Sequence, residues 1–294
     1  MKLSIITVNL NNAEGLKKTV ESVISQTFTD FEFIIIDGAS TDGSLEVVNN
    51  YQLSNLNFQL ISEPDKGIFD AMNKGILLAK GDFCQFLNSG DYLYSTTVLE
   101  EVFSREYSDD IVTGNFIELY DSKTALRKGR AYARQQQGKP LTMLDLFAGS
   151  LSHQATFIRR ELFDRYGLYN PEMKVASDWL FFLYTIGIKG VTVKYIDQTI
   201  VYFDMNGISN QSATSGASER MEALKSLLPP VIFEDYLYFT KIEHDFHYLI
   251  RYRLTYRIGR LINKLATAWF LFSGKIRALL GKIGFKIRHE ERTF

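Results

Sequence analysis

The feature that most constrains this fold is an alternation of short apolar runs and amphipathic segments over roughly the first ninety residues. Runs with strand character are predicted at residues 3–8, 31–36, 58–61 and 83–87. Segments with apolar residues at helical spacing lie between them, at 13–26, 43–50 and 68–79. Strands that lack polar alternation are buried on both faces, as in a parallel sheet covered by helices. The sequence therefore predicts an α/β fold with a mostly parallel sheet flanked by helices.

The pattern is less regular beyond residue 110. Strands are predicted at 111–117 and 191–196, and helices at 161–166 and 178–185. Residues 205–218 are polar and rich in Ser, Gly and Asn, which predicts a loop. After Pro229 and Pro230 the chain reads as helical and basic. We therefore expect a domain at 1–218, with halves at 1–95 and 96–218, followed by a helical tail at 219–294.

The charge is distributed unevenly along the chain. Residues 241–294 hold 12 Lys and Arg against 4 Asp and Glu, whereas the whole 294-residue chain has a net charge of −1. Apolar residues recur at helical spacing in this tail and alternate with cations, and Trp269, Phe270 and Phe272 lie among them. Such helices lie in the interface of anionic membranes, so we expect membrane association through 241–294. The alternative is a helix packed on the body with a solvated basic face.

Other features concern the compartment and the partners. No apolar stretch reaches the roughly eighteen residues that a membrane span needs, and the N-terminus does not read as a signal peptide. The single cysteine, Cys84, lies in an apolar run and is predicted to be a core residue. We expect a cytoplasmic protein, peripheral on the membrane. No nucleic-acid-binding motif is present, and the body is acidic.

Polar residues collect where the predicted strands end. Asp37 and Asp42 follow the second strand, residues 88–91 (NSGD) follow the fourth, and Asp178 begins a predicted helix. Ligands of open α/β sheets bind at the carboxyl ends of the strands. The chain lacks G-x-G-x-x-G after its first strand and any G-x-x-x-x-G-K-[ST] loop, which argues against a dinucleotide or Walker-type site. A diphosphate site without a glycine cradle needs a cation, which a carboxylate at a tight turn can bind.

Six segments together resemble the family 2 glycosyltransferases, which are inverting enzymes with the GT-A fold. They are residues 3–9 (LSIITVN), 36–44 (IDGASTDGS), 62–75 (SEPDKGIFDAMNKG), 86–91 (FLNSGD), 152–157 (SHQATF) and 176–179 (ASDW). The resemblance covers about residues 1–205. It implies a GT-A, Rossmann-like sheet, with the basic amphipathic helical extension at the C-terminus.

The resemblance also implies roles for individual residues. The donor-binding positions are Thr7, Val8, Asn9, Asp37, Lys66, Asp70, Asn73, Asn88, Ser89 and Gly90. His153, Gln154 and Trp179 would lie on the acceptor side. Asp91 would ligate Mn²⁺ or Mg²⁺, and Asp178 would be the general base. Residues 205–218 would be either a lid over the bound donor or a plain linker.

These residue types suit an inverting transfer. One carboxylate takes the proton of the acceptor hydroxyl as it attacks the anomeric carbon, and a divalent cation stabilises the leaving diphosphate. The chain departs from the family by having Asn88, Gly90 and Ser177 where acids are common, and it lacks the Gln-x-x-Arg-Trp signature of processive synthases. We therefore expect transfer of a single sugar, with UDP as the expected nucleotide, to a glycan or lipid-linked acceptor in bacterial polysaccharide biosynthesis.

Two alternatives remain at this point. One is a sugar-nucleotide-binding or membrane-assembly subunit without turnover, since the metal turn is depleted in acids. The other is a nucleotidyltransferase, which would require a basic glycine-rich loop after the first strand, where residues 9–12 read NLNN. Acceptor-binding residues are expected around 115–155 and in the tail, where no motif names them.

Overall fold

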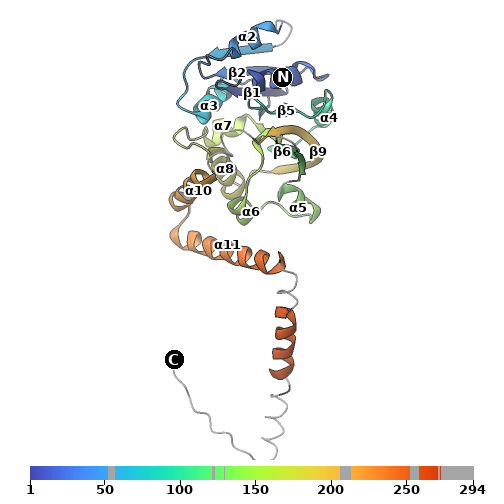
Figure 1. Cartoon of the computed structure of the whole chain (residues 1–294), viewed down its shortest axis with the longest axis vertical. Helices are drawn as coiled ribbons and strands as arrows, with labels where there is room; N and C mark the ends of the chain where they lie inside the picture. The colour runs from blue at the N-terminus through green and yellow to red at the C-terminus, as the bar shows by residue number, and fades with distance from the viewer. Residues whose placement is uncertain are drawn as a thin grey trace, which may run out of the picture. The chain divides into compact units, whose positions relative to one another are not determined.

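The structure is a computed structural model that describes residues 1–51, 57–120, 123–128, 130–205, 213–251, 258–270 and 272 (Figure 1). The chain divides into two compact units, Met1–Phe233 and Glu234–Phe294. The division falls after the predicted boundary at 218. The difference arises because Leu224, Leu228 and Phe233 are buried. The helix that carries Leu224, at 213–227, therefore belongs to the first unit.

The N-terminal half of the sheet is parallel, as predicted. Strand β1 (Leu3–Asn9) pairs with β2 (Phe31–Asp37) and with β4 (Phe83–Phe86), and β2 pairs with β3 (Asn57–Ser62). Helices α1 (Ala13–Ile24), α2 (Ser44–Asn50) and α3 (Ile68–Leu78) connect them. Every residue of β1 and β2 is buried, which explains the continuous apolar runs.

Successive residues of β1 face opposite layers of the fold. Ile5 belongs to the core cluster that contains Leu16 of α1, whereas Ile6 lies against α3. A Cβ at Gly75 of α3 would lie 2.4 Å from Cγ2 of Ile6, so only glycine allows this helix to pack so close to the strand. The two helices therefore fix the sheet from both sides and bring their N-terminal ends to the carboxyl edge of the strands.

The second half of the sheet contains antiparallel pairs. The strand order is β3-β2-β1-β4-β8-β6-β9-β5, and β7 pairs with β6. The strands are β5 (Tyr92–Leu93), β6 (Ile111–Tyr120), β7 (Lys123–Arg127), β8 (Thr156–Arg159) and β9 (Val193–Asp204). Strand β8 is antiparallel to both β4 and β6, and so joins the two halves into one sheet.

Short helices surround this half of the sheet (Figure 1). They are α4 (Val98–Phe103), α5 (Arg130–Gln136), α6 (Met143–Ala148), α7 (Glu161–Tyr166) and α8 (Ser177–Phe182). A 3₁₀ turn (His153–Ala155) precedes β8, and a π-helical segment (Leu183–Ile188) continues α8. The turn and the start of α8 carry His153 and Asp178, two of the predicted site residues.

Two sequence-based boundaries are wrong. Strand β9 does not end at 196 but continues to Asp204. The predicted loop at 205–218 ends earlier, because α10 (Ala213–Leu227) begins at 213, while residues 206–212 lie outside the described residues. The choice between a lid over the donor and a plain linker at 205–218 therefore concerns mostly residues outside the described ones. Cys84 is fully buried in β4, which confirms the predicted core position.

The C-terminal region is helical in its described parts, namely α11 (Pro230–Arg251) and residues 258–270. Among the residues that the structure describes, no helix combines the length and the apolar character needed to cross a bilayer. The rest of the predicted membrane-associating tail, at 252–257, 271 and 273–294, lies outside the described residues.

Candidate active site

The ends of β1 and β2 hold a buried carboxylate in a dense hydrogen-bond network. Asp37 accepts hydrogen bonds from the side chains of Asn9 (2.8 Å), Ser40 (2.6 Å) and Ser62 (2.8 Å). Burial raises the pKa of Asp37, but the hydrogen bonds from Ser40, Asn9 and Ser62 together hold that pKa below its ordinary value. Oδ1 of Asn9 is buried without a partner in the described part of the chain. Asp37 is therefore a fixed anion at the predicted nucleotide end.

The side chains of Thr7 and Val8 are core residues rather than exposed donor contacts. The Thr7 hydroxyl is fully buried and donates to the carbonyl of Leu87 at 2.7 Å. Val8 is 6% exposed. These residues fix the spacing between β1 and the turn after β4, and their buried side chains leave the backbone at the end of β1 as the part that would border the nucleobase.

The start of α3 places its charged residues at the surface. Lys66 is exposed, and its backbone N–H donates to the Asp70 carboxylate at 3.1 Å. Lys74, which sequence reasoning did not single out, lies 2.6 Å from Asp65 and 3.8 Å from Asp70. Burial lowers the pKa of Lys74, and the hydrogen bonds to Asp65 and Glu63 raise it by more. The helix thus opens with a compact ion-pair cluster.

Asn73 has a structural role in place of the predicted donor contact. Its amide donates to the backbone carbonyl of Tyr169 at 2.8 Å and accepts from the backbone N–H of Tyr169 at 3.0 Å. Both hydrogen-bonding ends of the side chain are thereby used. The pair ties α3 to the segment before α8, and so connects the two halves of the site.

The turn at residues 88–91 contains the second buried carboxylate. Asp91 is 3% exposed, and its Oδ1 accepts the backbone N–H of Asp204 at 2.9 Å. Burial raises the pKa of Asp91 to about 7, against the opposing effects of this hydrogen bond, of His153 and of Gln154. Gly90 has φ +105° and lies so close to Asp204 that a Cβ there would be 3.1 Å from its Oδ2. The carboxylate of Asp204 therefore borders the same turn as that of Asp91.

A chain of polar contacts links this turn to Asp178. Nδ1 of His153 lies 2.9 Å from Oδ2 of Asp178, and its Nε2 lies 3.4 Å from Nδ2 of Asn88. Since the Asn88 nitrogen is a donor, Nε2 is the acceptor and Nδ1–H donates to Asp178. Oδ1 of Asn88 is buried and unpartnered within the described residues. The structure thus brings together Asn88, Asp91, His153 and Asp178.

Two residues predicted for the acceptor side are buried in the structure. Trp179 is fully buried, and its indole N–H donates to the carbonyl of Leu146 at 2.6 Å. Gln154 is 4% exposed and accepts from the Ser152 hydroxyl at 2.8 Å. Trp179 thus anchors the start of α8 to α6, and the Gln154 side chain lies beside the buried Asp91, whose pKa its hydrogen bond lowers.

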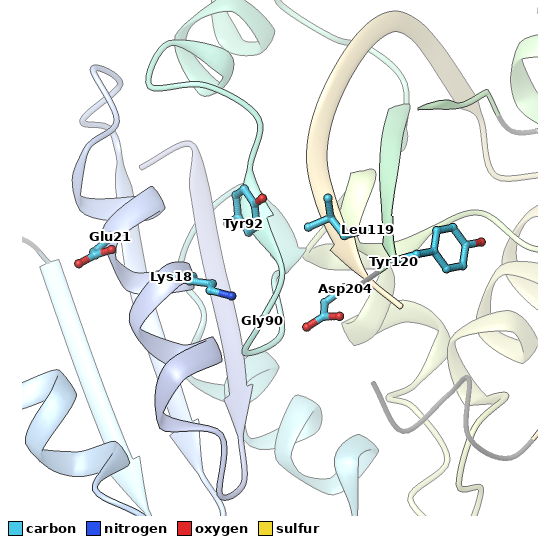
Figure 2. Close-up of a pocket in the computed structure, with 7 residues that line it drawn as sticks. All are labelled: Lys18, Glu21, Gly90, Tyr92, Leu119, Tyr120 and Asp204. Atoms are coloured by element: carbon cyan, nitrogen blue, oxygen red, sulfur yellow. The ribbon is translucent and has the colours of Figure 1, made fainter. Parts of the chain in front are cut away.

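A cleft of about 500 Å³ borders the turn (Figure 2). Its lining residues are Lys18, Glu21, Gly90, Tyr92, Leu119, Tyr120 and Asp204. Figure 2 shows the Asp204 carboxylate projecting between the Gly90 turn and Tyr120. The ring of Tyr92 stacks on Tyr202, 4.8 Å between centroids. Leu119 and Tyr120 belong to the region 115–155 that was expected to meet the acceptor.

The oxygen atoms at the turn fit a hard divalent cation only in part. Asp91 and Asp204 meet at the turn, and Asn88 in the same turn has a buried Oδ1 without a partner, but the described residues hold no group of three or more His, Cys, Asp and Glu that could hold a metal ion. Mg²⁺ sites that include substrate phosphates need only one or two protein carboxylates. The donor set therefore fits a cation that is shared with a diphosphate.

Comparisons with known proteins identify the family of the chain. The profile described as Glycosyl transferase family 2 matches residues 4–167. A PGL/p-HBAD biosynthesis glycosyltransferase from Mycobacterium bovis is 34% identical over 213 residues, which cover 70% of this chain and 78% of the relative. A cholesterol galactosyltransferase from Borreliella burgdorferi is 24% identical over 281 residues, 88% of this chain and 76% of the relative.

Solved structures show the same fold. Residues 1–349 of TarS from S. aureus in complex with UDP-GlcNAc superpose with a TM-score of 0.62 at 21% identity, over 81% of this chain and 70% of the TarS fragment. A mannosyltransferase from Pyrobaculum calidifontis in complex with GDP-Man and Mn²⁺ gives a TM-score of 0.60 at 15% identity, over 81% and 68% of the two chains. With its family profile, its relatives and its GT-A fold, the chain is a glycosyltransferase enzyme that belongs to family 2.

Proposed function

We propose that this enzyme transfers one sugar from a nucleotide-sugar, with UDP as the expected nucleotide, to a hydroxyl of a glycan or lipid-linked acceptor, and that it inverts the anomeric centre. The observation that carries the proposal is the contact chain from Asp178 through His153 to Asn88, beside the buried Asp91. It supports a general base on one side of the reacting carbon and a diphosphate site on the other.

Asp178 is the proposed base. Its side chain is 15% exposed, so it is largely shielded from solvent. His153 orients the carboxylate through the 2.9 Å contact, and the backbone N–H of Trp179 donates to Oδ1 at 2.7 Å. A carboxylate held in this way takes the acceptor proton in the step that forms the new glycosidic bond. These two contacts, one to each oxygen of Asp178, orient the carboxylate. The acceptor attacks the anomeric carbon directly, so no covalent enzyme intermediate is needed.

Asp91, Asp204 and Asn88 are the proposed ligands at the diphosphate end. When bound there, Mn²⁺ or Mg²⁺ would neutralise charge on the diphosphate as it leaves. Asp91 would give up its proton on binding the cation, since its pKa is about 7 without it. Asn9, Asp37 and Ser40 would bind the nucleoside, and the exposed Lys66 would lie near the donor.

Relatives and structural neighbours support the substrate classes. The Borreliella relative is named for cholesterol, a lipid acceptor, and the TarS and mannosyltransferase structures contain UDP-GlcNAc and GDP-Man. For this chain we propose a nucleoside diphosphate sugar as donor. The tyrosine-lined cleft at Gly90 and Asp204 would admit the acceptor, because aromatic rings suit the apolar faces of sugars and lipids.

Residues 258–270 and Phe272 are the proposed contact with an anionic membrane. Exposed apolar side chains form a stripe at helical spacing, namely Ile258, Leu261, Ile262, Leu265, Trp269 and Phe272. Arg260 and Lys264 lie at positions opposite this stripe on a helical projection. Such a helix lies in the headgroup region, which would place the enzyme at the cytoplasmic membrane surface. Full-length protein should float with vesicles that contain anionic lipid, and Trp269→Ala should weaken that binding.

The test of the transferase proposal is a donor screen. Wild-type protein would meet UDP-, GDP-, CMP- and dTDP-sugars with Mn²⁺, Mg²⁺ or a chelator, and both binding and donor hydrolysis would be measured. We expect metal-dependent binding of one donor that Asp91→Ala weakens. Asp164→Asn is the matched control, because this carboxylate is 65% exposed and pairs with Arg160 on α7. Loss of binding in the control, or equal binding with chelator and with metal, would contradict the proposed site.

A further inference from the structure

Helix α10 is fixed to the segment that carries Asp178. Glu219 accepts three consecutive backbone N–H groups, those of Lys174 at 2.7 Å and of Val175 and Ala176 at 3.0 Å each. These N–H groups lie just before the first turn of α8. A Cβ at Gly216 would be 3.3 Å from Cγ1 of Val175, so the helix also packs closely there. The residue after Glu219 is therefore held beside the proposed base.

That residue is Arg220. Its guanidinium carbon lies 5.1 Å from the centroid of the Trp179 ring, and Trp179 directly follows Asp178 in the chain. Burial lowers the pKa of Arg220, and the Asp178 carboxylate acts in the opposite direction. A guanidinium carries its charge at all physiological pH values and presents five N–H donors in a planar fork. A permanent cation therefore lies on a buried aromatic surface next to Asp178.

Within the part of the chain that the structure describes, the Arg220 guanidinium has its aromatic contact but no hydrogen-bond acceptor or ion-pair partner. Other arginines of the same half differ in this respect: Arg134 lies 2.6 Å from Asp145, and Arg159 donates to the carbonyls of Tyr107 and Asp109. A partly desolvated cation with unused donors is costly unless an anion meets it. Carboxylate and phosphate are the anions whose geometry the planar fork matches, and phosphate is the one that a nucleotide-sugar donor carries.

We propose that Arg220 is a phosphate-binding residue of the active site, and that Glu219 holds it in place. The inference rests on the proposed function, because it assigns the phosphate to a substrate of glycosyl transfer. Two substrates carry such a group: the nucleoside diphosphate of the donor, and a lipid-linked acceptor whose phosphate lies near the attacking hydroxyl. Neither glutamate nor arginine belongs to the segments that carry the family resemblance.

The experiment compares Arg220→Ala and Arg220→Lys with wild type by calorimetry on the full chain with Mn²⁺. In the first arm the ligands are UDP and UMP, or GDP and GMP if the protein prefers guanine. In the second arm dodecyl phosphate is titrated into protein saturated with the nucleoside diphosphate. Arg165→Ala is the control, since this arginine is 55% exposed and pairs with Glu161 on α7. Thermal melts establish that each variant is folded.

If the donor supplies the phosphate, Arg220→Ala should weaken diphosphate binding about tenfold to a hundredfold and leave monophosphate binding unchanged, with Arg220→Lys between them. If the acceptor supplies it, the same loss should occur for dodecyl phosphate alone. Unchanged affinity in both arms for a folded Arg220→Ala protein overturns the inference. Failure of the wild type to bind any nucleotide would instead overturn the proposed function, so the two failures are distinguishable.

Discussion

Replacing Asp91 by asparagine should stabilise the ligand-free protein at neutral pH, although the residue is proposed to bind the metal. Burial raises the pKa of Asp91 from 3.8 to about 7. Because the folded pKa lies above the unfolded one, the folded state binds more protons between these values. The carboxylate therefore destabilises the fold increasingly as the pH rises from about 4 to about 7.

The magnitude follows from the shift. At 1.36 kcal/mol per pKa unit, burying Asp91 costs the ligand-free fold about 4 kcal/mol at pH 8, and about 2 kcal/mol at pH 5, where the acid is ionised in the unfolded chain and protonated in the fold. Asparagine has nearly the same shape and keeps an oxygen that accepts the Asp204 N–H. Asp91→Asn should therefore raise the free energy of unfolding by an amount that approaches these values and grows with pH.

Urea unfolding with chelator present, followed by tryptophan fluorescence, measures this difference at several pH values. The chain has two tryptophans; Trp179 is fully buried and Trp269 is 70% exposed, so Trp179 dominates the signal change on unfolding. Asp164→Asn should show no comparable gain, because that carboxylate is exposed. A gain independent of pH, or a loss of stability at pH 8, would refute the assignment of Asp91 as a buried, destabilised acid.

Four further outcomes are expected. Mn²⁺ binding at pH 6 should release close to one proton per ion, falling toward zero above pH 8, as measured by calorimetry in buffers of different ionisation enthalpy, because Asp91 must deprotonate. Asp37→Asn should cost about 1–3 kcal/mol at pH 8, and the cost should shrink as the pH falls through 3.8 in urea titrations, because the folded pKa of Asp37 is lowered. Asp178→Asn should slow transfer about 10²–10⁴-fold with donor affinity retained, checked by kinetics and calorimetry. Trp179→Ala should cost about 3–5 kcal/mol in unfolding experiments, because its ring is fully buried.

The parallel half of the fold was predictable because both of its faces are covered. In β1 and β2 every residue is buried, so the strands appear in the sequence as uninterrupted apolar runs. The second half has this signal only in part, at the buried start of β6. Strand β9 contains Asp197 and Gln198 in its middle, and its pairing with β6 is irregular around Asn115. The apolar pattern that predicts a strand is interrupted at these polar residues. The strand itself continues, because Asn115 and Lys128 donate hydrogen bonds to the Asp197 carboxylate.

The same limit applies to the site. Motif spacing placed Asp91, His153 and Asp178 in order, and the structure brings them together. Spacing cannot say which way a side chain points at the start of a helix, which is why Trp179 was assigned to the acceptor. Asp204 was missed because the strand that carries it was predicted to end too early. Its position can be recognised only when β9 is followed to its last residue.

The burial of Cys84 has a practical consequence for spectroscopy. Its side chain is fully buried, and burial raises the pKa of the thiol to about 12, so the native fold offers no thiolate to a maleimide or a nitroxide reagent. A cysteine introduced at an exposed position, such as Ala217 on α10, would be labelled alone without first removing the native one. With a second introduced cysteine near the nucleotide end, the distance between the two labels would report the spacing between that end and α10. This distance could be followed in solution as donor is added.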